Sequence, residues 1–123
     1  MKKLFITLLI SAITAIAFAQ GQWQLLETKN QPGSRGECSL VAVGSKLYLV
    51  GGDGEARPVE AYDPTTNAWT KKATAPFTMH HFQSVGLGDK IYVLDAFYEG
   101  GYPDQIPLPN VYSYDTKKDT WTK

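Results

Sequence analysis

The sequence predicts an all-β fold built from repeated four-stranded antiparallel sheets, and three observations favour it. First, the chain repeats itself, because Tyr48 aligns with Tyr92 at an offset of 44 residues and Trp69 aligns with Trp121 at an offset of 52. Second, each copy contains short apolar runs separated by turn residues, as strands do. Third, the inner runs do not alternate between apolar and polar residues, which indicates sheets that are buried on both faces.

The N-terminal segment, residues 1–19, is expected to be a targeting signal and not part of the fold. Lys2 and Lys3 precede an apolar run from Leu4 to Phe18, and Ala17-Phe18-Ala19 has the small-x-small pattern of a signal-peptidase site. The apolar run is about 15 residues long, short of the roughly 20 that span a bilayer. We therefore expect a bacterial Sec-type signal peptide cleaved after Ala19, a secreted or periplasmic protein, and no membrane span after cleavage.

Residues 20–34 are expected to contain a lead-in strand around Trp23. The three tryptophans, Trp23, Trp69 and Trp121, are spaced by 46 and 52 residues, so each marks the same point of the repeat. A single strand that precedes the first complete unit fits a last unit whose other three strands are missing. We expect this segment to be the closing strand of that last unit.

The first complete unit, residues 35–76, is predicted to contain four strands. They cover Cys38–Val43, Lys46–Val50, Val59–Tyr62 and Ala68–Lys72. Gly44-Ser45 forms a tight hairpin turn between the first two strands. Asp63-Pro64 starts the turn between the last two, because proline fixes φ and the Asp side chain can accept an amide hydrogen bond. This register places Tyr62 opposite Trp69 as a stabilising cross-strand pair.

The second unit, residues 77–123, repeats this plan with one insertion. Gly88-Asp89 takes the place of the first hairpin turn, and Tyr114 is expected to face Trp121. The change of offset from 44 to 52 requires eight extra residues between Leu94 and Val111. We expect them to lie in a long loop, which is where binding residues tend to sit.

Four-stranded units of roughly 45–50 residues that are buried on both faces are typical of β-propeller blades. The residues resemble a kelch repeat, whose blade carries a glycine pair after the second strand, then a tyrosine, then a tryptophan after a short turn. Gly51-Gly52, Tyr62 and Trp69 match in the first unit. Tyr114 and Trp121 match in the second unit, where Asp95-Ala96 replaces the glycine pair. The glycines are expected to let the backbone pass a neighbouring blade where a Cβ would clash.

The resemblance extends to secreted bacterial kelch proteins that carry a galactose-oxidase-like label. It implies a ring of blades, and a ring needs about 4–8 of them to close. The sequence supplies about two, so we expect an incomplete ring that is the N-terminal fragment of a longer propeller. The alternative is a short protein that assembles several chains into one ring. In both cases the exposed apolar faces predict contact with the remaining blades or self-association.

Segments that precede the first strand and follow the second strand of each blade are expected to meet at one mouth of the ring. The inserted loop in the second blade holds aromatic and acidic side chains that can stack on a sugar ring and hydrogen-bond its hydroxyl groups. The alternative is a stiff loop that packs its own aromatic side chains. The predicted ligand-binding residues are Arg35, Arg57, His80, His81, Phe97, Tyr98, Glu99, Tyr102 and Asp104.

No catalytic residue, metal site or cofactor is expected in this chain. His80 and His81 are neighbours in an extended segment, so their side chains are expected to point to opposite sides. A copper site would need further His or Tyr ligands from other blades. Cys38 is the only cysteine, and its apolar strand context predicts a buried thiol.

The sequence therefore predicts a binding module for a glycan or another extracytoplasmic ligand such as a protein. With 12 basic and 12 acidic residues, the chain lacks the basic footprint of a nucleic-acid-binding protein. One alternative is part of a kelch-type enzyme, either a sugar epimerase or a galactose-oxidase-like copper oxidase, whose catalytic residues lie mostly in missing blades. A non-functional truncated product is the other.

Overall fold

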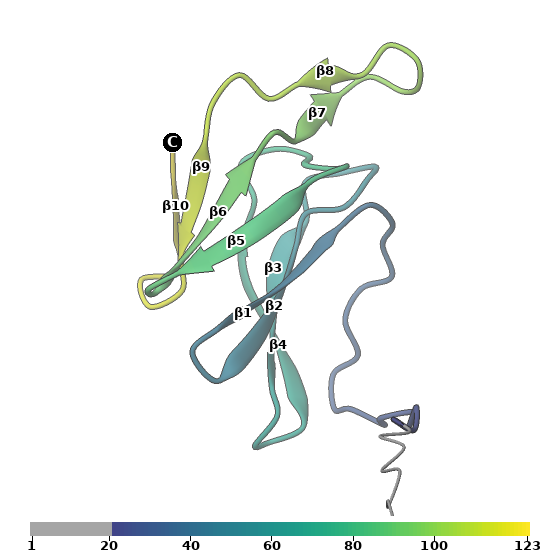
Figure 1. The fold of residues 1–123 in the computed structure, drawn as a ribbon, viewed down its shortest axis with the longest axis vertical. Helices are drawn as coiled ribbons and strands as arrows, with labels where there is room; N and C mark the ends of the chain where they lie inside the picture. The colour runs from purple at the N-terminus through teal and green to yellow at the C-terminus, as the bar shows by residue number, and fades with distance from the viewer. Residues whose placement is uncertain (1–20) are drawn as a thin grey trace, which may run out of the picture.

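The computed structural model describes residues 21–123, so the expected signal peptide, residues 1–19, lies outside the described part. All regular secondary structure in residues 21–123 is β, in two four-stranded antiparallel sheets and one two-stranded sheet (Figure 1). The described residues contain no helix long and apolar enough to cross a membrane. The all-β prediction is confirmed.

The first sheet follows the order of the chain. It contains β1 (Ser39–Val43), β2 (Lys46–Val50), β3 (Pro58–Asp63) and β4 (Ala68–Thr74), with each strand paired to the next. The four predicted strands are therefore confirmed to within two residues at each end. Tyr62 pairs with Trp69 across the β3–β4 hairpin, and their ring centroids lie 5.2 Å apart.

The second sheet repeats the first. It contains β5 (Gln83–Leu87), β6 (Lys90–Leu94), β9 (Tyr112–Asp115) and β10 (Thr120–Thr122), paired in that order. Tyr114 pairs with Trp121, and the centroid separation of 5.3 Å matches that of the first sheet. Two such four-stranded antiparallel sheets are consistent with the predicted β-propeller blades.

The two sheets pack against each other through their first strands and at a hairpin. Gly86 of β5 lies so close to β1 that a Cβ there would be 2.6 Å from the Ala42 carbonyl oxygen. At the hairpin, a carboxylate oxygen of Asp119 accepts a 2.7 Å hydrogen bond from the Ala73 amide of β4. Tyr114, Ile91 and Val93 of the second sheet are fully buried in the shared core. These contacts help to fix the two blades relative to each other.

The eight-residue insertion differs from its expected loop conformation, because it forms a hairpin. β7 (Phe97–Glu99) pairs with β8 (Ile106–Pro107), and the hairpin projects beyond the end of the second sheet (Figure 1). Aromatic residues favour strand conformation in β7. Gly100, with a φ of +77°, begins the connection. The hairpin stands beside the segment that precedes β5, since His80 and Phe97 form an isolated bridge.

The lead-in segment differs from the expected strand. Residues 21–34 contain no regular strand, and Trp23 is fully exposed. Lys29 alone pairs with the first sheet, through two 3.0 Å backbone hydrogen bonds to Asn67 and Trp69. A regular strand needs a continuous ladder of backbone pairs, and between residues 21–34 and the first sheet the described residues form only this isolated bridge. Its role as a closing strand stays a prediction.

Candidate functional site

The end of β2 is tied to the segment that precedes β5. Gly51 has a φ of +68°, and a Cβ there would lie 2.5 Å from the Met79 carbonyl oxygen and 2.6 Å from the Phe82 ring. The amide of Gly52 donates a 2.7 Å hydrogen bond to the same Met79 oxygen. The glycine pair therefore lets one blade pass the next without a clash, as the sequence predicts.

This close approach brings four segments together around a cleft of about 680 Å³. They are the residues before β1, the loop after β2, the residues before β5, and the β7–β8 hairpin. The expectation that these segments meet at one rim is confirmed. The cleft is lined by Glu37, Asp53, Gly54, Thr78, His80, His81, Tyr98, Glu99, Gly100, Gly101, Tyr102 and Gln105.

The structure places five of the nine predicted ligand-binding residues on the cleft and four outside its lining. His80, His81, Tyr98, Glu99 and Tyr102 line it. Phe97 lies behind His80, with stacked rings whose centroids are 6.1 Å apart. Asp104 is exposed on the hairpin and outside the lining.

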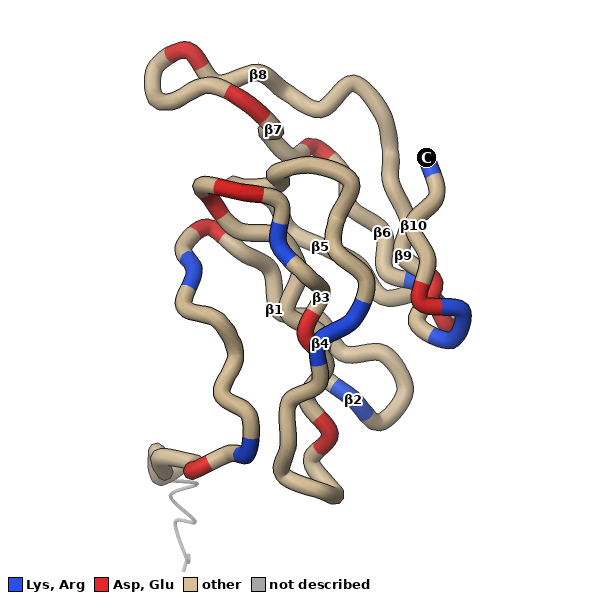
Figure 2. Tube along the Cα trace, turned by 180° about the vertical axis from the view of Figure 1, so that it is seen from behind, with Lys and Arg blue, Asp and Glu red and all other residues tan. Residues whose placement is uncertain are grey.

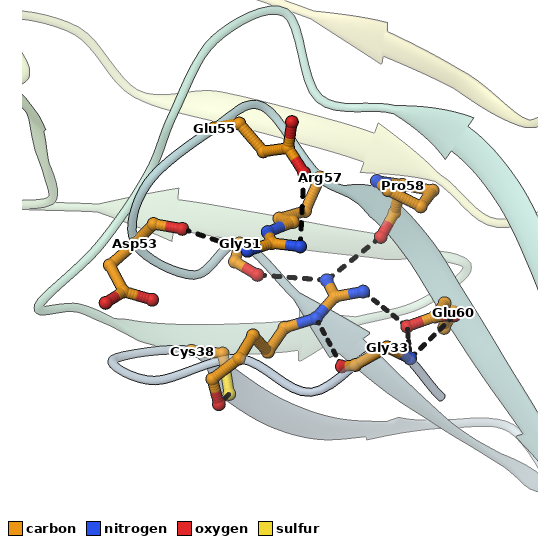
Figure 3. A network of polar contacts seen from close by, with 9 residues as sticks. Gly33, Cys38, Gly51, Asp53, Glu55, Arg57, Pro58 and Glu60 are labelled. Atoms are coloured by element: carbon orange, nitrogen blue, oxygen red, sulfur yellow. Dashed lines mark hydrogen bonds and ion pairs between the residues drawn. The ribbon is translucent and has the colours of Figure 1, made fainter. Parts of the chain in front are cut away.

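Arg35 is a buried structural residue, which differs from the predicted place at the ligand rim. Its side chain is 2% exposed and forms an ion pair with the equally buried Glu60. Its guanidinium also donates to the carbonyl oxygens of Gly33, Gly51 and Pro58, at 3.3, 3.0 and 3.1 Å. Figure 3 shows these partners gathered around one guanidinium. With its donors committed to them, Arg35 fixes the loop after β2 to β3.

Arg57 also stabilises that loop and does not line the cleft. It forms an ion pair with Glu55 at 3.3 Å and donates a 3.5 Å hydrogen bond to the Asp53 carbonyl oxygen (Figure 3). Cys38, predicted to be buried in the first strand, is half-buried just before β1. Its thiol lies 4.0 Å from the Arg35 carbonyl oxygen.

The two histidines converge, and the expectation that they point to opposite sides is wrong. Their Nδ1 atoms lie 2.9 Å apart. The alternation of side chains requires extended backbone, but His81 has a φ of +53°. This left-handed turn brings its ring back beside that of His80.

Glu37, which sequence reasoning missed, completes a cluster with the histidines. Its carboxylate oxygens lie 3.5 Å from His80 Nδ1 and 3.0 Å from His81 Nε2. A signal was present, because Glu37 stands 44 residues before His81 and so occupies the equivalent position of the repeat. Glu37 has the same left-handed conformation, with a φ of +52°.

The lining of the cleft is acidic. Three of its lining residues, Glu37, Asp53 and Glu99, are acidic, and none of the described residues that line it is Lys or Arg. Figure 2 shows acidic positions on β7, at the hairpin tip and on the neighbouring loops. The Coulomb interaction therefore favours a cationic ligand, disfavours an anion and does not oppose a neutral molecule.

Comparison with known proteins places these features among kelch repeats. Residues 34–76 match the Kelch motif family. The chain is 31% identical over 115 residues to N-(sulfonatooxy)prop-2-enimidothioate sulfolyase from Thlaspi arvense, a match that covers 83% of this chain and 31% of that protein. It is 29% identical over 101 residues to Kelch-like protein 30 from Homo sapiens, covering 82% of this chain and 17% of that protein.

A third relative is Kelch repeat and BTB domain-containing protein 8 from Danio rerio, at 32% identity over 91 residues, covering 68% of this chain and 13% of that protein. The chain thus spans 31% of the length of the first relative and 17% or less of the other two. These matches support a kelch-repeat family. Kelch repeats generally mediate protein binding.

Proposed function

We propose that this chain, with its kelch motif and two kelch-type blades, is a binding module whose cleft takes a neutral glycan. One observation supports the proposal. Tyr98, Glu99 and Tyr102, all from the β7–β8 hairpin, line a cleft of about 680 Å³. A cleft of this size with aromatic walls and a few convergent polar groups suits a small organic ligand. Tyrosine faces can stack on the apolar face of a sugar ring, and carboxylates accept hydrogen bonds from its hydroxyl groups.

The charge of the cleft supports a neutral sugar over an acidic one. Glu37, Asp53 and Glu99 would repel a carboxylate, sulfate or phosphate group, and no Lys or Arg among the described lining residues offsets them. A neutral ligand gains hydrogen bonds to these acceptors without that repulsion. We therefore expect neutral oligosaccharides to bind more tightly than sulfated or sialylated ones.

The proposal is tested by calorimetric titration of neutral glycans into the full chain and its Tyr102 variants. Tyr102→Ala removes the stacking face and is expected to weaken binding roughly three- to tenfold. Tyr102→Phe is the matched control, because it keeps the face and loses only the hydroxyl group. Tyr102 is 91% exposed, so neither change should affect folding. Equal affinity of the Ala variant and the native chain would place the glycan elsewhere.

A protein ligand is the second candidate, because kelch repeats generally mediate protein binding. The acidic cleft would then favour a segment that carries Lys or Arg side chains. The two candidates differ in their salt dependence. Binding of a basic peptide should weaken steeply as ionic strength rises, whereas binding of a neutral sugar should not. Titrations at low and high salt therefore separate them.

An enzymatic role for a longer protein is favoured by one observation, the similarity to a plant sulfolyase. That name describes an enzyme whose substrate carries an anionic sulfonatooxy group, for which the acidic cleft of this chain is poorly suited. The epimerase and oxidase alternatives make separate predictions. An epimerase would convert ring sugars without metal, and an oxidase would bind copper and release peroxide. Turnover of either kind would replace the binding-module proposal.

We also propose that the chain acts outside the cytoplasm of a bacterium, in the manner of the galactose-oxidase-like kelch proteins it resembles. The support is the positively charged start, the apolar run and the Ala17-Phe18-Ala19 pattern of the sequence. N-terminal sequencing of the protein from its host is the test. We expect the mature chain to begin at Gln20. A chain that retains Met1 would contradict this proposal.

A further inference from the structure

We propose that Glu37, His80 and His81 form a binding site for one divalent transition-metal ion such as Zn²⁺, in the wall of the cleft between the two blades. Each residue offers one donor atom, and these atoms all lie within 4.8 Å of one another. Two imidazoles and one carboxylate are donors that zinc accepts. The site draws Glu37 from the first blade and both histidines from the second, so it lies where the blades meet.

The spacing of the donors fits a small metal ion. Zinc binds imidazole nitrogen and carboxylate oxygen at about 2.0–2.2 Å, so two donors of a tetrahedral site lie roughly 3.3 Å apart. The two oxygens of the Glu37 carboxylate lie 3.5 Å from His80 Nδ1 and 3.0 Å from His81 Nε2, which brackets that value. Because one donor atom from each residue lies within 4.8 Å of the others, adjustment of the side chains would bring the three donors around one ion.

Local backbone strain marks the same residues. Glu37 and His81 both have φ values near +50°, at 52° and 53°, a conformation that residues other than glycine rarely adopt. They occupy equivalent positions of the two repeats, and a 3.3 Å hydrogen bond joins the His81 amide to the Glu37 carbonyl oxygen. Strain of this kind persists only where the surroundings hold it, and it gathers at functional sites. Here it turns the two side chains toward each other.

Neighbouring groups hold the histidines in place. The backbone of His80 forms two 3.0 Å hydrogen bonds with that of Phe97, and the two rings stack. Gln105 of the hairpin places its amide nitrogen 3.2 Å from His81 Nδ1. A contact between two ring nitrogens also requires one of them to lack a proton and present a lone pair. Such outer contacts orient ligands before the metal arrives.

The surroundings favour a cation and leave room for a further ligand. Asp53 and Glu99 add negative charge to the same cleft. Three protein donors leave a fourth position of a tetrahedral ion open, as in zinc sites that bind a water or a substrate. His81 has a 43% exposed side chain and faces the cleft, so the open position can take an oxygen atom of the bound molecule. This last step rests on the proposed glycan function, whereas metal binding does not.

The test is titration of Zn²⁺ into chelator-treated full chain by calorimetry, with a purification tag that contains no histidine. We expect one ion per chain. Glu37→Gln keeps the shape of the side chain but removes its charge, and His81→Asn tolerates the positive φ of that position. Each variant should weaken zinc binding by at least about tenfold. Glu27→Gln and Cys38→Ser are the controls, which should stay within about twofold of the native chain, since Glu27 is exposed and neither residue belongs to the cluster or lines the cleft.

The outcomes separate metal binding from glycan binding. Loss of zinc affinity in Glu37→Gln, with native affinity in Glu27→Gln, supports the site. No heat of zinc binding by the native chain, or equal affinity in Glu37→Gln, overturns it. Loss of glycan binding in Tyr102→Ala with zinc binding retained would leave both proposals standing. Native glycan affinity in Tyr102→Ala, with zinc binding intact, would remove only the glycan proposal. Circular dichroism of each variant confirms that it is folded before its affinity is compared.

Discussion

At the scale of single residues, burial decides what Arg35 does. Its charge and its place before β1 suggest a contact with a ligand, but its side chain is 2% exposed and so is that of Glu60. Three carbonyl oxygens accept hydrogen bonds from the same guanidinium. A buried charge is tolerated only when it is paired and hydrogen-bonded in this way. The pair therefore belongs to the framework that positions the cleft.

Removing one partner of this buried ion pair should destabilise the folded protein. We predict that Arg35→Ala lowers the free energy of unfolding by about 3–5 kcal/mol, because Glu60 is left as an uncompensated buried charge. The control is Lys46→Ala, which breaks the exposed pair of Lys46 with Asp63 and should change stability far less. Urea denaturation monitored by tryptophan fluorescence measures both. Similar losses in the two variants would contradict the structural assignment of Arg35.

Protonation of Asp119 at low pH should weaken the contact between the two blades. Its carboxylate accepts hydrogen bonds from the Tyr114 hydroxyl at 2.5 Å and from the Ala73 amide at 2.7 Å. These two contacts hold the pKa of Asp119 below its ordinary value of 3.8. Burial and the same carboxylate raise the pKa of Tyr114. In the first blade, Asn67 occupies the equivalent position and accepts from Tyr62.

We predict that Asp119→Asn makes the protein less sensitive to acid. The folded state lowers this pKa, so the ionised carboxylate stabilises the fold above about pH 5 and that stability is lost as the pH falls below 4. Asn can accept the same hydrogen bonds without titrating, as Asn67 does in the first blade. The fall in Tm between pH 6 and pH 3 should be smaller in the variant. An unchanged fall would contradict this role of Asp119.

At the scale of elements, substitution of two glycines with similar φ values can separate the cost of a positive φ from the cost of a steric clash. Gly44, in the β1–β2 turn, has a φ of +59° and nothing within 4 Å of a built Cβ. Gly51 has a φ of +68° and the Met79 oxygen at 2.5 Å. We predict that Gly44→Ala costs about 1–2 kcal/mol through backbone strain alone. Gly51→Ala should cost about 1–3 kcal/mol more, through the added clash. Equal losses by thermal denaturation would show that the blades do not meet at Gly51.

The β7–β8 hairpin offers a similar comparison with binding as the readout. At Gly100 a Cβ would lie 2.1 Å from the Asp104 carbonyl oxygen, whereas at Gly101 it would meet nothing within 4 Å. We predict that Gly100→Ala distorts the hairpin and lowers glycan affinity by at least about threefold, an effect expected of a displaced stacking face. Gly101→Ala should bind as the native chain does. Reduced affinity in both variants would point to a general loss of structure.

At the scale of the whole molecule, apolar side chains on the first strands of both blades are exposed. Leu40 of β1 and Val85 and Leu87 of β5 are 52%, 53% and 70% exposed. Exposed apolar residues on strand edges are sites of association. We predict that the isolated chain self-associates as its concentration rises and that Leu87→Lys weakens this. Sedimentation velocity measures both. A chain that stays monomeric at high concentration would contradict the prediction.

The repeated pattern of the sequence was sufficient to predict the all-β fold. Strand pairing follows local patterns, because Gly44-Ser45 and Asp63-Pro64 each lie in a turn between strands that are adjacent in the sequence, and Tyr62 and Trp69 flank the second turn. The strand ends, the register and the two-blade plan were therefore predictable. The meeting of four segments at one rim was also predictable. In an antiparallel pair, the second strand ends at the same end of the sheet where the first strand begins.

Only the tertiary structure decided what the rim residues do. The sequence predicted that Arg35 contacts a ligand, because it cannot show which charged side chains are buried. It predicted that His80 and His81 point to opposite sides, because it cannot show which residues have a positive φ. Packing within the first blade buries Arg35 against Glu60, and the left-handed backbone at Glu37 and His81 brings both to His80. These outcomes depend on residues 25 to 44 positions apart. Local sequence patterns determine where the strands form, and contacts between distant segments determine the geometry of the cleft.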